Sequence, residues 1–89
     1  MITKSIEIRN RLGLHARAAA KLVHTSSRFR SSVRIRKDDE EVDGKSILGI
    51  LLLAASNGTT LQVIVEGEDE REASTAVEDL IARRFDEEE

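Results

Sequence analysis

The chain has 89 residues, a formal net charge of −3 and no cysteine. This length fits one small domain, which we expect to span residues 1–89, and the lack of cysteine excludes disulfides and thiolate metal sites. No apolar run reaches the roughly 18–20 residues of a membrane span, and residues 1–5 lack the apolar stretch of a signal peptide, so we expect a cytoplasmic protein without membrane contact.

The first part of the chain predicts a strand followed by a helix. Ile2, Ile6 and Ile8 alternate with polar residues, as in a half-buried strand. Residues 16–27 predict a helix. Its apolar positions recur at helical spacing: Ala16, Ala19, Ala20 and Val23. No Ser, Thr, Asp or Asn stands at the capping position, so we expect the first backbone N–H groups of this helix to lack a side-chain acceptor.

The middle of the chain predicts two strands and a short helix. Val33 and Ile35 alternate with arginines and predict a second strand. A polar turn then leads to a short third strand over residues 41–43. Ser46 is a good N-cap residue for a short apolar helix over residues 47–52.

The last part predicts a fourth strand and a third helix. Leu61, Val63 and Val65 alternate with other residues and give the strand one wholly apolar side. Asp69 and Glu72 resemble a capping box at the start of the helix. One apolar stripe runs along that helix: Ala73, Ala76, Val77, Leu80 and Ile81.

These elements follow the order β-α-β-β-α-β-α. Strands with one apolar face, together with amphipathic helices, indicate a sheet that is covered on one side only. We therefore expect an α+β open-faced sandwich, in which three helices lie on one face of a four-stranded antiparallel β-sheet.

His15 is the first candidate for chemistry, because it immediately precedes the alanine-rich helix. An anion on its ring would meet the backbone N–H groups of Ala16 and Arg17 and the positive end of the helix dipole. Arg17 adds a fixed charge and a guanidinium that suits phosphate. Imidazole is a nucleophile near neutral pH, and no base or metal ligand stands beside it in the sequence. The pattern predicts a site that carries a phosphoryl group, with no metal and no cofactor.

Positive charge is concentrated in the first half of the chain and negative charge at its end. The basic residues of the first half include Arg9, Arg11, Arg17, Lys21, Arg28, Arg30, Arg34, Arg36 and Lys37. A small RNA-binding α+β domain is therefore an alternative. Only Phe29 and Phe85 are aromatic, so base stacking is poorly provided for and we expect no nucleic-acid partner. We interpret the acidic residues 86–89 as a frayed end.

Two motifs, Gly13-Leu14-His15-Ala16-Arg17 and Gly44-Lys45-Ser46-Ile47-Leu48, resemble the HPr family. Its members are histidine phosphocarriers of the bacterial phosphoenolpyruvate-dependent phosphotransferase system, in sugar uptake or nitrogen-related regulation. The resemblance covers nearly the whole chain in length, element order and motif spacing. It implies that His15 accepts a phosphoryl group from phosphorylated enzyme I and passes it to an enzyme IIA, while Arg17 holds the phosphate oxygens. The protein would be a monomeric group carrier rather than an enzyme.

Two positions depart from most members of the sugar branch. Those members have proline at the position of Ala18 and a polar residue at the position of Leu12. The residues around His15 and the run Leu51-Leu52-Leu53-Ala54-Ala55 are more similar to the nitrogen-related branch, NPr. Both branches stay open at this point.

The second motif carries a regulatory and a docking hypothesis. The resemblance implies that Ser46 is phosphorylated where an HPr kinase is present, although a helix cap also explains this serine. Three helices on one sheet cannot bury every side of an apolar helix. We therefore expect Ile47, Leu48 and Leu51 to form a docking surface for the partner proteins. A regulatory binding module, controlled through Ser46 without phosphate carriage, is an alternative function that gives His15 no role.

Overall fold

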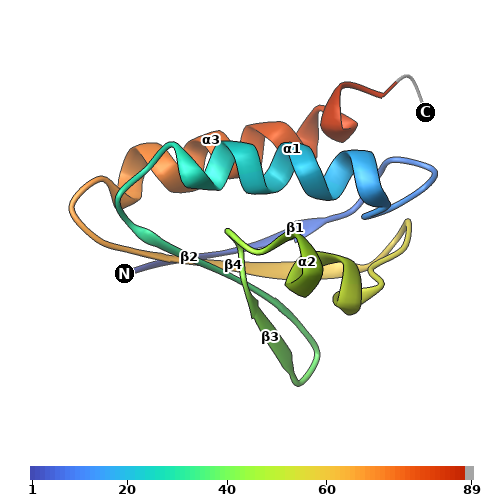
Figure 1. Ribbon diagram of the computed structural model, residues 1–89, viewed down its shortest axis with the longest axis horizontal. Helices are drawn as coiled ribbons and strands as arrows, with labels where there is room; N and C mark the ends of the chain where they lie inside the picture. Colours follow the sequence, from blue (N-terminus) through green and yellow to red (C-terminus); the bar gives the residue numbers. More distant parts are fainter. Residues whose placement is uncertain (88–89) are drawn as a thin grey trace.

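The computed structural model describes residues 1–87. Its elements are β1 (Ile2–Glu7), α1 (Ala16–Ser27), β2 (Ser32–Lys37), β3 (Glu40–Asp43), α2 (Ile47–Leu53), β4 (Thr60–Glu66), α3 (Glu70–Ala82) and the 3-10 helix η1 (Arg84–Asp86). The strands pair antiparallel in the order β1-β4-β2-β3, with α1 beside α3 over the sheet and α2 against α1 (Figure 1). The predicted open-faced sandwich is confirmed. Among the described residues, no helix has the length and hydrophobicity needed to cross a membrane.

The alternation of apolar and polar residues places the core on one face of the sheet. The central strand β4 pairs with both β1 and β2, so that Val65 lies opposite Ile2 on one side and Val33 on the other. Leu61, Val63 and Val65 are buried, whereas the alternate residues of β4 are exposed or half-buried. The apolar face is therefore continuous across the strands, and the helices cover it.

The buried face of α1 differs from the predicted one. Its buried residues are Ala18, Ala19, Leu22 and Ser26. Ala16 and Ala20 are exposed, and Val23 is only half-buried. Alanine occupies nearly every position from 16 to 20, so small side chains do not define a single face. The rotation of the helix follows Leu22 instead, because its larger apolar surface gains more free energy on burial.

The predicted capping box of α3 does not form. Asp69 occupies the N-cap position, but its side chain makes no cap hydrogen bond. Its carboxylate accepts from the backbone N–H groups of Arg30 and Ser31, both at 2.9 Å, and from the Ser31 hydroxyl at 2.5 Å. Asp69 thus ties the start of α3 to the loop between α1 and β2, and Glu72 is exposed.

The chain turns back after α3 through residues 83–87, which we call the tail hook. Three successive residues have left-handed φ angles: 58° at Arg84, 55° at Phe85 and 62° at Asp86. Phe85 is fully buried, and the Lys21 ammonium donates to its carbonyl at 2.6 Å. The interpretation of residues 86–89 as a frayed end is therefore wrong as far as Glu87, and residues 88–89 lie outside the described part of the chain.

The carboxylate of Asp69 makes the stability of the fold depend on acidity. Hydrogen bonds from the Ser31 hydroxyl and the Arg30 backbone hold the pKa of Asp69 at about 2, below its ordinary value of 3.8. Because the folded-state pKa is depressed, its stabilisation is fully present above pH 3.8 and is lost as the pH falls toward about 2. Asp69→Asn should therefore lower the urea midpoint at neutral pH, and the difference from wild type should close over that range.

The matched control for this prediction is Asp39→Asn, which removes the same charge from an exposed turn. It should leave the urea midpoint almost unchanged at every pH. A difference between Asp69→Asn and wild type that stays constant down to the lowest pH would show that the charge of Asp69 is not the cause.

Candidate functional site

The loop before α1 is held close to the connection between α2 and β4. Gly13 has a φ of +67°, and a Cβ at this position would lie 2.5 Å from the carbonyl oxygen of Ala55 and 2.8 Å from Cα of Ser56. The N–H of Leu14 donates to the same Ala55 carbonyl at 2.9 Å. Glycine is thus required both by its conformation and by the close approach, and it fixes the path of the chain into His15.

His15 is the N-cap residue of α1. Its backbone is extended, with φ −76° and ψ 180°, and its Nδ1 accepts from the backbone N–H of Arg17 at 3.3 Å. The expectation that α1 begins without a side-chain acceptor is therefore wrong, because the imidazole itself fills that role. The 3.3 Å separation is long for a hydrogen bond, so this contact is weak.

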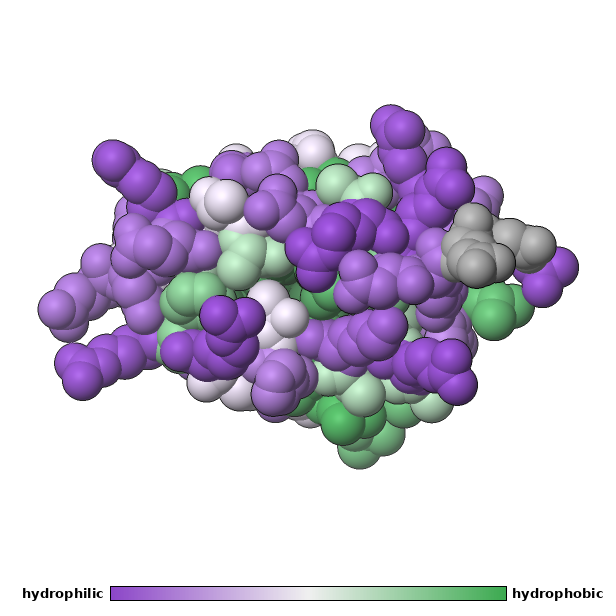
Figure 2. All heavy atoms as spheres, turned by 90° about the horizontal axis from the view of Figure 1, so that it is seen from above, coloured by the Kyte–Doolittle hydropathy of each residue, from purple (hydrophilic) through white to green (hydrophobic). Residues whose placement is uncertain are grey.

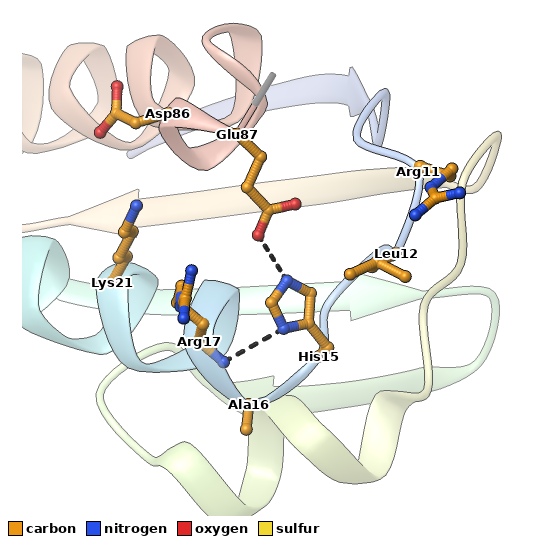
Figure 3. Close-up of a pocket in the computed structure, with 8 residues that line it drawn as sticks. All are labelled: Arg11, Leu12, His15, Ala16, Arg17, Lys21, Asp86 and Glu87. Atoms are coloured by element: carbon orange, nitrogen blue, oxygen red, sulfur yellow. Dashed lines mark hydrogen bonds and ion pairs between the residues drawn. The ribbon is translucent and has the colours of Figure 1, made fainter. Parts of the chain in front are cut away.

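The ring of His15 also contacts the tail hook, as Figure 3 shows. Its Nε2 lies 2.5 Å from Oε2 of Glu87. The other oxygen of Glu87 accepts from Nδ2 of Asn10 at 3.0 Å. Asn10 is fully buried, and its Nδ2 also donates to the carbonyl of Gly13 at 2.8 Å. No base stands beside His15 along the sequence, but folding brings Glu87, which is 72 residues further along the chain, against the ring.

Cationic side chains surround the open side of the ring. Arg17 and Lys21 extend from α1 and Arg11 from the preceding loop, and with the ring they line an open hollow (Figure 3). The Lys21 ammonium is hydrogen-bonded to the tail hook. The guanidinium of Arg17 is exposed and has no partner within residues 1–87. Arg17 is therefore available to an anion that enters the hollow.

The carboxyl group of Glu87 stays ionised in this setting. Burial by itself raises its pKa, but hydrogen bonds from Asn10 and His15, together with the positive charge of Lys21, bring the pKa below the ordinary value of 4.5. At neutral pH the carboxylate is a pure hydrogen-bond acceptor.

Ser46 caps α2 as predicted. Its hydroxyl oxygen accepts from the backbone N–H of Gly49 at 3.1 Å. The side chain is half-buried, and it stands where the chain enters the helix that carries the predicted docking residues.

Exposed apolar side chains gather on α2 and on the loop before α1. They are Leu12, Ile47, Leu48, Leu51 and Leu52, which we call the leucine patch. Leu48 is 66% exposed and Leu52 is 68% exposed, whereas Leu53 is buried at 1%. The face shown in Figure 2 is mostly hydrophilic, and a group of hydrophobic side chains protrudes at its lower edge. The predicted residues Ile47, Leu48 and Leu51 are exposed on α2, and Leu12 lines the hollow at His15.

The structure brings together the residues that the sequence motif selected. The ring of His15, the backbone N–H groups at the start of α1 and the Arg17 side chain face one hollow (Figure 3). Such a site can hold a tetrahedral anion that is bonded to the ring. Sequence reasoning missed Glu87, Asn10 and Leu52, because no local pattern indicates which turn of chain returns to His15 or which leucine faces outward.

The chain is similar to known proteins over nearly its whole length. Residues 2–83 match the family described as PTS HPr component phosphorylation site. Phosphocarrier protein HPr of Neisseria meningitidis serogroup A is 49% identical over 87 residues, which are 98% of each chain. Phosphocarrier protein HPr of Pseudomonas aeruginosa is 52% identical over 83 residues, 92% of each chain. The crystal structure of HPr-C-His from Thermoanaerobacter tengcongensis superposes with a TM-score of 0.97, at 46% identity and 100% coverage of both chains.

The close approach at Gly13 predicts that two glycine substitutions differ greatly in their effect on thermal stability. A left-handed alanine is disfavoured by about 1–2 kcal/mol at any position, but at Gly13 a backbone clash is added. Gly13→Ala should therefore lower the thermal unfolding midpoint well below that of Gly58→Ala. Gly58 has a φ of +90°, and an added Cβ there would meet nothing within 4 Å, so it isolates the conformational cost. Equal midpoints for the two variants would show that the loop is not held against residues 55–56.

Proposed function

The chain belongs to the HPr family of phosphocarrier proteins, and we propose that His15 is the residue on which it carries the phosphoryl group. The observation that supports this most directly is the place of the ring at the N-cap of α1, with Nδ1 facing the backbone N–H of Arg17. Phosphate oxygens on the ring would meet the N–H groups of Ala16 and Arg17 and the positive end of the helix dipole.

The proposed donor is phosphorylated enzyme I, and the proposed acceptor is an enzyme IIA of the sugar-uptake or nitrogen-related branch. A lone pair on the ring forms the P–N bond while the bond from phosphorus to the donor breaks, and that electron pair leaves with the donor. The P–N bond is labile enough for the same exchange at the acceptor. The carrier contributes positioning and charge, and its partners supply the remaining catalytic groups.

Arg17 is the proposed charge partner of the phosphate. A cation in the first turn of a helix is disfavoured by the dipole, and the Arg17 guanidinium has no protein partner in the described chain. A dianionic phosphate on His15 would remove both disadvantages. The planar guanidinium also suits bidentate binding of phosphate oxygens.

The leucine patch is the proposed docking surface for these partners. One of its residues, Leu12, also lines the hollow at His15. A partner that covers the patch would bury its apolar area and bring its own phosphoryl group toward His15. Charged residues are depleted at the centre of such interfaces, and all five residues of the patch are apolar.

We also propose that Ser46 is a modification site for an HPr kinase. A phosphate at this N-cap is compatible with the helix dipole, so α2 would remain folded. It would, however, place negative charge beside Ile47 and Leu48. Modification would therefore act on docking rather than on the fold, in addition to the carriage of phosphate on His15.

The assignment of the carrier residue predicts a clear chemical result. With phosphoenolpyruvate and enzyme I, the wild-type protein should gain one acid-labile, base-stable phosphate, and His15→Ala should gain none. Arg17→Ala should stay folded and accept phosphate more slowly, since a lost charged hydrogen bond is worth on the order of 1.5–3 kcal/mol. Mass spectrometry and quenched time courses measure both effects. Undiminished uptake by His15→Ala would refute the assignment.

The docking surface predicts that affinity and stability respond to different leucines. Leu48→Glu should weaken the binding of enzyme I without unfolding the protein, because Leu48 is exposed. The control Leu53→Ala removes a buried side chain of the same helix and should lower the stability by about 2–5 kcal/mol while the folded protein keeps its affinity. Calorimetric titration and urea unfolding separate these outcomes. If Leu48→Glu loses stability before affinity, the patch is not a docking surface.

The proposed role of Ser46 is tested with a charge mimic. Ser46→Asp should retain the fold, because aspartate is itself a good N-cap, yet it should bind enzyme I less tightly. Desolvation of the added carboxylate, or its repulsion from acidic groups on the partner, is the expected cause. Ser46→Ala should lose about 1 kcal/mol of cap stability and transfer phosphate normally. Wild-type affinity for Ser46→Asp at low salt would leave Ser46 as a helix cap alone.

A further inference from the structure

The tail hook holds a carboxylate against His15 in a backbone conformation that ordinary residues avoid. Arg84, Phe85 and Asp86 are all left-handed, and none of them is glycine. Strained backbone of this kind persists only where the surroundings impose it, and it is concentrated at functional sites. Burial of Phe85 anchors the hook, but it does not explain why the chain then delivers Glu87 to the ring.

The two contacts of the ring together define its protonation. Nε2 faces the ionised carboxylate of Glu87, which can only accept, so Nε2 must carry the proton. Nδ1 faces the backbone N–H of Arg17, which can only donate, so this weaker contact also favours a lone pair on Nδ1. A neutral ring protonated at Nε2 satisfies both contacts. The lone pair of Nδ1 then points to the start of α1, where the phosphate oxygens would lie.

We propose that Glu87 is a positioning residue for phosphoryl transfer, which holds the proton of His15 on Nε2 and thereby makes Nδ1 the nucleophile. The proposal rests on the proposed function of His15. When Nδ1 bonds to phosphorus, the bond from phosphorus to the donor breaks and its electron pair leaves with the donor. The proton stays on Nε2, and the ring becomes positively charged. On transfer to the acceptor, the electron pair of the P–N bond returns to Nδ1.

The carboxylate of Glu87 is suited to each of these stages. At 2.5 Å from Nε2 it orients the neutral ring, and it stabilises the positive charge that appears when the phosphoryl group is attached. Its second oxygen is held by the buried Asn10, so the side chain cannot rotate freely away from the ring. Asp86, the neighbouring acid of the hook, pairs with Arg83 at 3.0 Å instead. Of the two acids of the tail hook, Glu87 is the one that contacts His15.

The first experiment measures the tautomer directly, without any partner protein. Imidazole nitrogen shifts of the ¹⁵N-labelled protein, recorded where the ring is neutral, should show wild-type His15 protonated on Nε2. Glu87→Ala should give a mixture of the two tautomers. Glu87→Gln keeps the size of the side chain but has one acceptor oxygen for two donors, so it should also lose the pure Nε2–H form. The control Glu78→Gln removes a carboxylate of α3 that is paired with Lys4 of β1, and its His15 tautomer should match that of wild type.

The second experiment measures the rate at which phosphorylated enzyme I transfers its phosphoryl group to each variant. Glu87→Ala and Glu87→Gln should transfer roughly tenfold to a hundredfold more slowly, with unchanged circular dichroism, and Glu78→Gln should equal wild type. If both Glu87 variants keep the Nε2–H tautomer or the wild-type rate, the proposal is overturned while the function of His15 stands. Failure of wild-type His15 to accept phosphate at all would overturn the proposed function itself, and the role of Glu87 with it.

Discussion

The site depends on one buried amide, that of Asn10, because it joins segments that are remote in the sequence. Its Nδ2 donates to the Gly13 carbonyl at 2.8 Å and to Glu87 at 3.0 Å, and its backbone carbonyl accepts from the side chain of Asn57 at 3.2 Å. The side-chain oxygen has no partner among residues 1–87. All hydrogen bonds of this side chain within residues 1–87 are therefore donated by Nδ2. They fix the loop before α1 and the tail hook relative to each other, and thereby fix the position of His15.

Elements with a strong local pattern could be predicted from the sequence. The alternation of apolar and other residues in β4 fits only a strand with one buried face. The Ser46 hydroxyl finds its donor, the N–H of Gly49, only three residues along the chain. The placing of His15 at the start of α1 is likewise local, since the motif itself contains the helix start. These features depend on residues that are close in the sequence, so the rules of helix capping and hydrophobic periodicity can predict them.

The remaining features depend on contacts that no local pattern contains. His15 and Glu87 are 72 residues apart, and Asp69 lies 38 residues from Ser31. An acidic run has no period that selects one carboxylate, so Glu87 resembles its neighbours until the path of the hook is known. The prediction of the buried face of α1 was wrong for a related reason. A run of alanines offers several equivalent faces, and packing against the rest of the fold, including α3, determines which one is buried.

The topology also orders the events of folding. Ile2 pairs with Val65, and β4 in turn pairs with β2, so the sheet closes only after loops that span most of the chain have lost their entropy. During synthesis on a ribosome, α1 and its histidine emerge long before the hook does. A nascent chain therefore exposes His15 without its acidic neighbour, and the arrangement around the ring arises only once residue 87 has been released.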